Sequence, residues 1–292
     1  MKNSNENLYK NKSQIASVLH RLSKNKLAMF GLLLLIIMIL IAIFADLIVD
    51  YDEMAIGQNI QERLQKPSAE HWFGTDHFGR DIFARIVHGT RISLSLGIFA
   101  MVIAVAVGSV LGAISAYYGG RTDNAVMRFM DILLAIPPIL MSISIVSALG
   151  QSMTNLLIAL SIAYVPVFAR VIRSSILSVK GQEFVEAAKA CGTGDARIIF
   201  KHIIPNAVGP IIVQATLAMG STILIISSLS FMGLGVKPPA PEWGTMLYEG
   251  RDFIRQAPYL ILFPGAAITI SVISLNLLGD GLRDALDPRL KD

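Results

Sequence analysis

A polar, basic segment at residues 178–210 interrupts an otherwise hydrophobic chain. Within it, one acidic residue, two alanines, a glycine and a proline stand at defined intervals: Glu186, Ala187, Ala188, Gly192 and Pro205. These residue types are suited to binding another protein. Small alanines can be pressed into a groove of a partner protein, while long charged side chains at the edge of the groove form ion pairs. The segment therefore predicts a mechanical joint with another protein.

Two short helices should position these residues. The first should cover residues 182–191 and end at Gly192, because glycine adopts the left-handed conformation that closes a helix without strain at Cβ. One face of this helix should carry Phe184, Ala188 and Cys191. The second helix should cover residues 195–203 and end before Pro205, which cannot continue it. The alternative is an ordinary amphipathic loop that lies on the lipid surface.

The composition is that of a membrane protein. The mean hydropathy is +0.59 and only 16% of the residues are charged, so the chain has far more apolar residues than one soluble core would bury. The net charge is +4, but the basic residues are sorted by loop and form no single patch, so we expect no nucleic-acid partner. Cys191 is the only cysteine, which excludes an internal disulfide and any site of several thiolates.

Six stretches are long and apolar enough to cross a bilayer as helices, which predicts an all-α, polytopic fold. They cover residues 27–49, 91–118, 129–149, 154–177, 211–236 and 259–280. The first is too long for the apolar part of a secretory signal and is expected to remain as an anchor. The chain then divides into a basic tail (1–26), this anchor (27–49), a loop (50–90), a transmembrane domain (91–282) that contains the segment 178–210, and a second tail (283–292).

The basic residues outside the spans predict the orientation. Seventeen Lys and Arg residues lie on the side of the two tails and the segment 178–210, and seven lie in the longer loops of the other side. Cytoplasmic loops retain positive charge, so both termini and the segment 178–210 should be cytoplasmic, and the loop 50–90 extracytoplasmic.

The spans contain signs of close packing and of bends. Small residues recur every four positions in the second span and should form one stripe for a neighbouring helix: Ala100, Ala104, Gly108, Gly112 and Ala116. Prolines within three later spans favour kinks or breaks: Pro137, Pro138, Pro166 and Pro264. The chain has no visible internal repeat, and a complete secondary transporter usually moves two halves about a midplane site. A second subunit should therefore supply the other half of the pathway.

The same residues speak against two rival functions and against ATP hydrolysis by this chain. An intramembrane enzyme would need a nucleophile with a base, but the five histidines lie outside the spans and hydroxyls such as Ser142 and Ser161 have no base beside them. An ion-coupled carrier would need a buried carboxylate, and Asp131 is better explained by pairing with Arg128 or Arg170. The dipeptide Gly-Lys never occurs, so the chain has no P-loop, and ATP hydrolysis must occur on other subunits.

The spacing of Glu186-Ala187-Ala188, Gly192 and Pro205 resembles the cytoplasmic loop of the membrane subunits of binding-protein-dependent ABC importers. His202 departs from the apolar residue of that pattern, and Ile204 replaces the commoner leucine. Two further stretches, His71–Asp81 with Arg91-Ile92-Ser93-Leu94, and Gly279–Arg289, are similar to one permease subunit of dipeptide, oligopeptide and nickel importers. The likeness covers nearly the whole chain from residue 70.

The resemblance implies a core of five helices in the fold of the methionine-importer permease, preceded by one extra N-terminal span. It implies that Glu186, Ala187, Ala188 and Gly192 dock on an ATP-binding subunit. It also implies several partners in a bacterial or archaeal cytoplasmic membrane: a second homologous permease, two ATP-binding subunits, an extracytoplasmic substrate-binding protein and membrane lipid. Peptides are the expected substrate, with nickel or a metal-chelator complex as the alternative, and an ion-coupled secondary transporter as the alternative of another class.

The sequence suggests fewer residues for the remaining sites. Polar side chains that could line the pathway are Ser144, Tyr164, Thr216 and Ser227. Asp76 and Asp81 should cap the amphipathic segment that leads into the second span. His71, His77 and His88 are common types at a membrane interface, so we expect neither a metal site nor a cofactor, and no catalytic residue.

Overall fold

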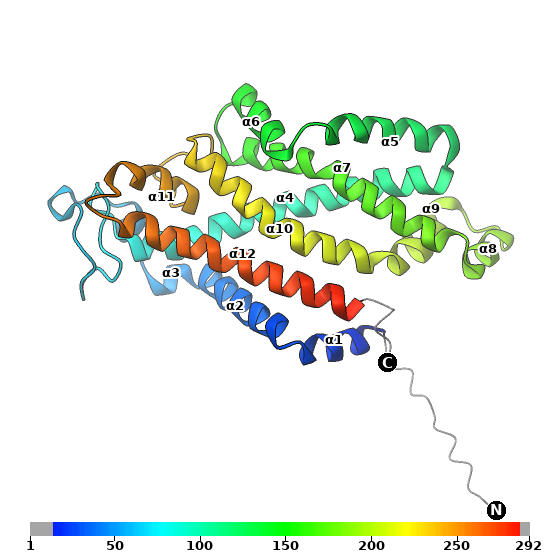
Figure 1. Ribbon diagram of the computed structural model, residues 1–292, viewed down its shortest axis with the longest axis horizontal. Coiled ribbons are helices and arrows are strands. Elements are labelled where there is room, and N and C mark those ends of the chain that lie inside the picture. Colours follow the sequence, from blue (N-terminus) through cyan, green and yellow to red (C-terminus); the bar gives the residue numbers. More distant parts are fainter. Residues whose placement is uncertain (1–13, 287–292) are drawn as a thin grey trace, which may run out of the picture.

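The computed structural model describes residues 14–286 and shows an elongated bundle of helices (Figure 1). Within this range the fold is all-α, and the β-structure is limited to an isolated bridge between Thr75 and Asp81. Five of the described helices are long and apolar enough to cross a membrane: α2 (Lys26–Ile43), α4 (Ile82–Tyr118), α7 (Met153–Lys180), α10 (Val208–Phe231) and α12 (Tyr259–Leu286). The expected all-α, polytopic architecture is confirmed.

The third expected span, 129–149, is not one straight helix. The structure has α5 (Gly120–Leu134) and α6 (Pro138–Leu149), whose axes differ by 84° across the short break between them. Pro137 and Pro138 explain the break, because neither has an N–H to continue the hydrogen bonds of α5 and the residue before a proline is driven out of the helical conformation. The pair forms either a broken sixth span or a re-entrant loop. Pro166 and Pro264, in contrast, lie inside continuous helices.

The second span begins earlier than expected. α4 starts at Ile82 and not at residue 91, and it runs for 37 residues. Asp81 caps its first turn by accepting a hydrogen bond from the backbone N–H of Ala84 at 2.8 Å. The first nine residues of α4 were therefore predicted, wrongly, to be part of the loop 50–90. The reason is that Arg85 and His88 interrupt the apolar run, so the span was predicted to begin only after them.

The stripe of small residues on α4 packs against α7 of the same chain. A Cβ atom at Gly108 would lie 2.7 Å from Phe168 Cβ, and one at Gly112 would lie 2.5 Å from the carbonyl oxygen of Ala169. All five stripe residues are buried. The stripe is therefore a packing surface, as expected. Because α7 of the same chain covers it, the stripe is not evidence for contact with a second subunit.

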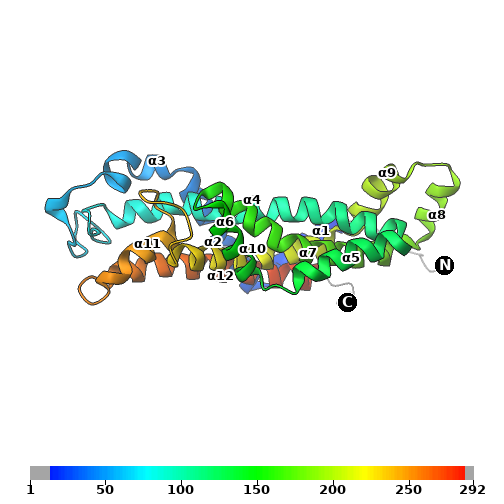
Figure 2. The same cartoon turned by 90° about the horizontal axis from the view of Figure 1, so that it is seen from above.

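The connecting segments gather at the two ends of the bundle (Figures 1 and 2). One end carries α3 (Ala45–Ile48), two single turns (Tyr51–Ile56 and Ile60–Glu62), α11 (Trp243–Gly250) and the turn Arg251–Phe253. The other end carries α8 (Glu183–Ala190), α9 (Asp195–Arg197), a π-helical turn (Ile198–Ile203) and a 3₁₀ turn (Ile204–Asn206). α1 (Gln14–Lys24) packs against the last turns of α12, so both ends of the described chain lie toward the end of the bundle that carries α8.

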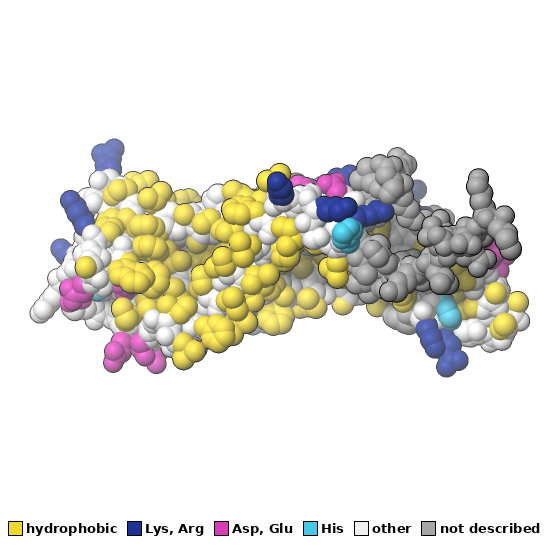
Figure 3. Space-filling view, turned by 90° about the horizontal axis from the view of Figure 1, so that it is seen from below, with side chains coloured by type: hydrophobic (Ala, Val, Ile, Leu, Met, Phe, Trp, Pro, Cys, Tyr) yellow, Lys and Arg dark blue, Asp and Glu magenta, His cyan; other side chains and the backbone are white. Residues whose placement is uncertain are grey.

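The outer surface matches this arrangement. In Figure 3, hydrophobic side chains form a broad continuous surface, whereas charged side chains gather at the two ends and in one group beside the grey atoms. Large apolar side chains of α2 such as Phe30, Leu33 and Leu40 are exposed, although they belong to a helix of almost continuous apolar sequence. An apolar belt with polar ends is the surface of a protein that spans a bilayer.

Candidate functional site

The segment between α7 and α10 is built from the two helical parts that the sequence predicts. The first is α8, and Gly192 follows it with φ of +70°. The backbone N–H of Thr193 donates to the carbonyl oxygen of Ala188 at 3.1 Å, and that of Gly192 donates to Lys189 at 2.9 Å. This is the glycine-terminated helix end that satisfies the last carbonyl groups. The expected role of Gly192 in local structure is therefore confirmed.

The buried face of α8 differs from the expected one. Val185 is completely buried, in one cluster with Ile198 and Ile203 of the following π-helical turn. Phe184 and Cys191, which were expected to share the apolar face with Ala188, are exposed, and Ala188 is only partly buried. In a helix of eight residues, one branched side chain that reaches the neighbouring turn decides the packed face, and the periodic pattern is too short to reveal it.

The outward face of α8 carries the residues of the docking motif. Glu186 and Ala187 are both exposed. Among the described residues, no ion pair or side-chain hydrogen bond involves the Glu186 carboxylate, so its charge is not used inside the chain. A Cβ atom added at Gly192 would meet nothing within 4 Å, so this glycine is retained for its backbone conformation and not for lack of space in the subunit. The motif thus presents an acidic side chain next to small ones on a protruding helix.

The second helical part is less regular than expected. Residues 195–203 form α9 and the π-helical turn, and Pro205 lies in the 3₁₀ turn that follows. α10 begins at Val208, shortly after Pro205, so the proline stands at the end of the segment as expected. Ile198, Ile199 and Ile203 are buried and hold the turn against the rest of the segment.

Polar side chains attach this segment and the end of α7 to α4, and none of these contacts is predicted by the sequence. The hydroxyl of Tyr117, near the end of α4, donates to Asp195 Oδ1 in α9 at 2.6 Å. Lys180, the last residue of α7, donates from Nζ to the carbonyl oxygens of Ala116 and Tyr117 at 2.9 and 2.6 Å. The Lys189 ammonium of α8 lies 5.4 Å from the centre of the Tyr117 ring, within range of a cation–π interaction. Tyr117 therefore connects α4 with both helical parts of the segment.

Two ion pairs fasten α5 to α7 near the same end. The Arg173 guanidinium donates two hydrogen bonds of 2.6 Å to the two oxygens of Asp123, and the Ser115 hydroxyl of α4 also donates to Asp123. Arg170 pairs with Asp131 at 2.7 Å. The expectation that Asp131 is neutralised by a basic neighbour is confirmed for Arg170. These contacts join α4, α5 and α7 at the end of the bundle that carries α8.

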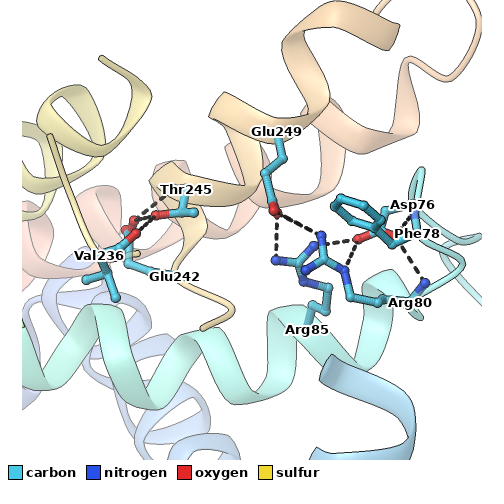
Figure 4. Close-up of polar contacts among 8 residues, drawn as sticks. All are labelled: Asp76, Phe78, Arg80, Arg85, Val236, Glu242, Thr245 and Glu249. Atoms are coloured by element: carbon cyan, nitrogen blue, oxygen red, sulfur yellow. Dashed lines mark hydrogen bonds and ion pairs between the residues drawn. The ribbon is translucent and has the colours of Figure 1, made fainter. Parts of the chain in front are cut away.

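A second polar cluster lies at the opposite end of the bundle (Figure 4). The carboxylate of Asp76 accepts from Arg80 Nε at 2.6 Å and from Arg85 Nη1 at 2.5 Å, and Glu249 of α11 accepts from both arginines at 2.8 to 3.0 Å. Asp76, Arg80 and Arg85 are buried. Burial alone would raise the pKa of Asp76, but Arg85, Arg80 and two backbone N–H donors together hold this pKa below its usual value.

This cluster revises the role expected of Asp76. Asp81 caps α4, but Asp76 lies in the ionic cluster and accepts the backbone N–H groups of Phe78 and Arg80 within its own turn. Asp81 has a second role, since its Oδ2 lies 2.8 Å from His71 Nδ1. The loop before α4 is joined to α11 by the ion pair between Arg80 and Glu249, which lie 169 positions apart in the chain.

Glu242 fixes the start of α11 beside this cluster. Its buried carboxylate accepts the backbone N–H groups of Gly244 and Thr245 at 2.9 and 2.8 Å. The Thr245 hydroxyl lies 2.9 Å from the carbonyl oxygen of Val236 (Figure 4). A carboxylate at this position satisfies donors that no helical carbonyl reaches.

The four residues suggested for the pathway are not brought together. The hydroxyls of Ser144 and Thr216 donate to carbonyl oxygens four residues earlier in their own helices. Thr216 lines an apolar cavity of about 530 Å³ between α2, α4, α10 and α12, whereas Ser227 lines another of about 470 Å³ between α10, α11 and α12. Tyr164 is buried in α7 and lines neither cavity. A common pathway for the four residues stays a prediction.

The three histidines of the loop and of α4 lie in separate surroundings. His71 pairs with Asp81, His88 Nε2 lies 3.0 Å from the carbonyl oxygen of Val49, and His77 packs between the rings of Phe78 and Phe253. Among residues 14–286, no group of three or more His, Cys, Asp or Glu side chains could hold a metal ion.

The chain is similar to known transport proteins. Residues 108–292 match the family of binding-protein-dependent transport system inner membrane components, and residues 13–67 match the N-terminal TM domain of oligopeptide transport permease C. The chain is 53% identical to the dipeptide transport system permease protein DppC of Alkalihalophilus pseudofirmus over 93% of its length and 88% of the relative's. It is 44% identical to the glutathione transport system permease protein GsiD of Escherichia coli over 93% of its length and 89% of the relative's.

The solved structures add a comparison of folds. A chain of the MetNI methionine ABC transporter, in inward facing conformations, superimposes with a TM-score of 0.52 at 18% sequence identity. The likeness covers 68% of the present chain and 93% of the other. At this identity the comparison bears on the fold alone, and it confirms the expected core of the methionine-importer permease.

Proposed function

The chain belongs to the family of binding-protein-dependent transport system inner membrane components, and from this premise we propose that it forms one half of the translocation pathway of an ATP-driven peptide importer. It is a multi-pass ABC importer permease subunit. The observation that carries the proposal is the protruding helix α8, whose Glu186 and Ala187 are exposed, while Tyr117 of α4 bonds to Asp195 in the same segment. Lys180, at the end of α7 where the segment begins, bonds to the last turn of α4. This arrangement suits transmission of force from an external ATPase to the membrane helices.

Peptides are the substrate class that the relatives favour. The two relatives described above are named as dipeptide and glutathione permeases, and both align over nine tenths of this chain. The nickel alternative has less support, because the described residues provide no set of metal-binding side chains. A metal-chelator complex would need no such set, so the ligand of the extracytoplasmic binding protein must decide between it and a peptide.

The other subunits of the importer are inferred from the missing P-loop and from the name of the family, which includes a binding protein. The sequence has no Gly-Lys pair and therefore no P-loop, so two ATP-binding subunits would hydrolyse ATP. A second, homologous permease would complete the pathway, and a substrate-binding protein would deliver the peptide from outside. Both termini and α8 would face the cytoplasm, where the excess of Lys and Arg lies.

The subunit would work by a conformational cycle. ATP closes the two ATPases around the nucleotide, and α8 moves with the groove in which it sits. Tyr117, Lys180 and Lys189 carry this displacement into α4 and α7, and the helices reopen toward the substrate-loaded binding protein. The free energy must come from a difference in the affinity of the two ATPase states for α8, since a segment that bound both states equally would shift nothing.

Reconstitution of the four-subunit complex in liposomes with its binding protein tests this function. Glu186→Lys replaces a possible ion pair with repulsion, and Gly192→Leu imposes strain of about 1–2 kcal/mol at a positive φ and adds bulk at the docking surface. Both variants should insert at normal abundance, lose most peptide uptake and retain ATP hydrolysis that substrate no longer stimulates.

Gly192→Asn is the matched control for this experiment. Asparagine tolerates the left-handed conformation, so this variant should keep most of the uptake. Full transport by both Glu186→Lys and Gly192→Leu would show that α8 is not the coupling joint. Loss of uptake together with loss of the complex would assign these residues to assembly.

A further inference from the structure

A cavity of about 520 Å³ lies where α1 meets the last turns of α12. Its lining combines basic, acidic and small residues: His20, Arg21, Lys24, Asn25, Gly281, Asp284 and Ala285. Figure 3 shows Lys, Arg and His side chains gathered beside the apolar surface in this region. Among the described residues, no ion pair involves Arg21, Lys24 or Asp284, so neither of the two permanent cations is neutralised by the carboxylate that shares the cavity with them.

The cavity lies next to the start of a candidate membrane span. α2 starts its membrane crossing at Lys26, only two residues after α1 ends at Lys24. The exposed side chains of Leu19 on α1 and Leu27 at the start of α2 flank the basic residues. A site with cations toward water and apolar side chains toward the bilayer offers one surface to a phosphate and another to an acyl chain.

Apolar contacts and a helix cap fix α1 against α2 and α12. Leu22 is buried together with Ala28 of α2 and Ala285 of α12, and Val18 packs against this group. Asn25 ends α1 and caps α2 through a hydrogen bond from the backbone N–H of Ala28 to its side-chain oxygen, 3.1 Å long. These apolar contacts use one face of α1, which leaves Arg21 and Lys24 at the cavity.

We propose that this cavity binds the phosphate of an anionic phospholipid headgroup, with Arg21 and Lys24 as its main ligands. Two permanent cations against one carboxylate give the site a net positive charge at neutral pH, which favours phosphatidylglycerol over zwitterionic phosphatidylcholine. A free phosphate would bind the same cations but would not use Leu19 and Leu27. Bound lipid would join α1, α2 and α12, and this role is independent of the transported substrate.

The test measures the lipids that remain bound to the complex after purification. The full-length chain, expressed with its partner subunits, is equilibrated in detergent with equal amounts of phosphatidylglycerol and phosphatidylcholine, and retained lipid is quantified by mass spectrometry. The wild type should retain phosphatidylglycerol preferentially. The double variant Arg21→Gln/Lys24→Gln should lose at least five-fold of this preference, since each cation near a membrane surface contributes about that factor.

Two further variants keep the result interpretable. Arg63→Gln/Lys66→Gln removes the same charge from exposed positions at the opposite end of the bundle and should leave the preference unchanged. Asp284→Asn removes the carboxylate of the cavity and should increase the preference, so a failure of the double variant to assemble would not leave the proposal untested.

Three results with the variants would overturn the proposal: unchanged lipid preference in Arg21→Gln/Lys24→Gln, an equal loss in the control pair, or no increase in Asp284→Asn. Addition of excess inorganic phosphate separates the two sources of the anion. Retained phosphatidylglycerol should resist this competition, and its displacement would assign the cavity to a free phosphate instead of a lipid.

Discussion

The hydroxyl of Tyr117 and the carboxylate of Asp195 form a 2.6 Å hydrogen bond between the end of α4 and the segment that follows α8. The bond joins residues 78 positions apart. Lys180 strengthens the same junction, since its ammonium donates to two carbonyl oxygens in the last turn of α4. The segment between α7 and α10 is thus attached to α4 by defined polar contacts and not only by its chain connections to α7 and α10.

The first prediction concerns this bond. Tyr117→Phe removes the hydroxyl and keeps the ring under Lys189, so it should cost the junction about 1.5–3 kcal/mol, the range for a hydrogen bond to a charged group. We expect peptide uptake in liposomes to fall several-fold at normal subunit abundance, with ATP hydrolysis retained. Tyr118→Phe is the control, because Tyr118 is exposed and its hydroxyl forms no hydrogen bond with any residue that the structure describes. Equal uptake by wild type and Tyr117→Phe would show that the bond does not transmit force.

Sequence reasoning reached the fold because the main signals are local. Long apolar runs revealed five of the six expected spans, and Gly192 was identified as a helix end because a positive φ has few other occupants. The break between α5 and α6 was predicted only in part. Pro137 and Pro138 predicted a bend, but the apolar run across them was long enough to be read as one span.

The polar junctions could not be predicted for a physical reason. Tyr117 with Asp195, and Arg80 with Glu249, are pairs of single residues 78 and 169 positions apart. No periodicity marks such pairs, and an arginine next to a glycine-rich turn reads equally well as an exposed charge. Only the tertiary fold brings them together, so the residues that join α9 to α4 and α11 to the loop before α4 were missed, although the two helical parts around Gly192 were predicted.

The second prediction tests the packing of α4 on α7. Gly112→Val should sharply reduce the amount of subunit in the membrane, because its Cβ would lie 2.5 Å from the backbone carbonyl oxygen of Ala169, which cannot move independently of α7. Overpacking of this kind costs about 1–3 kcal/mol or more. Gly265→Val makes the same change in α12 where a Cβ meets nothing within 4 Å, and it should be tolerated. Immunoblots of membrane fractions measure both, and normal abundance of Gly112→Val would contradict the packing.

The third prediction concerns orientation. In a Cys191→Ser background, Lys26→Cys should be protected from an impermeant thiol reagent added outside intact cells, and Lys237→Cys should react. Both side chains are exposed in the subunit, so the bilayer and not the fold decides their access. Glu242 would be an unsuitable probe on the outer side, because it is buried as the cap of α11. Labelling of Lys26→Cys from outside would show that the orientation is the reverse of the predicted one. α8 would then lie outside the cell, where it could not contact a cytoplasmic ATPase.

The last prediction is a pH dependence of the cluster that joins the loop before α4 to α11. Burial lowers the pKa of His77 below 6.5, an effect that the nearby carboxylates of Asp76 and Glu249 oppose without cancelling. A base whose pKa is lowered by folding binds its proton more readily in the unfolded chain, so its contribution to stability is complete above pH 6.5 and is lost as the pH falls toward the folded value. Asp76 behaves differently. Its lowered pKa gives a contribution that is complete above pH 3.8 and constant at mildly acidic pH.

The thermal midpoint of the purified complex should therefore fall by a few degrees between pH 7 and pH 5, and His77 should account for part of this fall. His77→Phe keeps the aromatic packing against Phe78 and Phe253 but cannot bind a proton, so the fall should be smaller in this variant. His202→Gln removes a histidine at the opposite end of the bundle and should leave the fall unchanged. If His77→Phe and wild type lose stability in parallel, protonation of His77 does not loosen the junction between α11 and the loop, and the acid sensitivity has to come from groups outside this cluster.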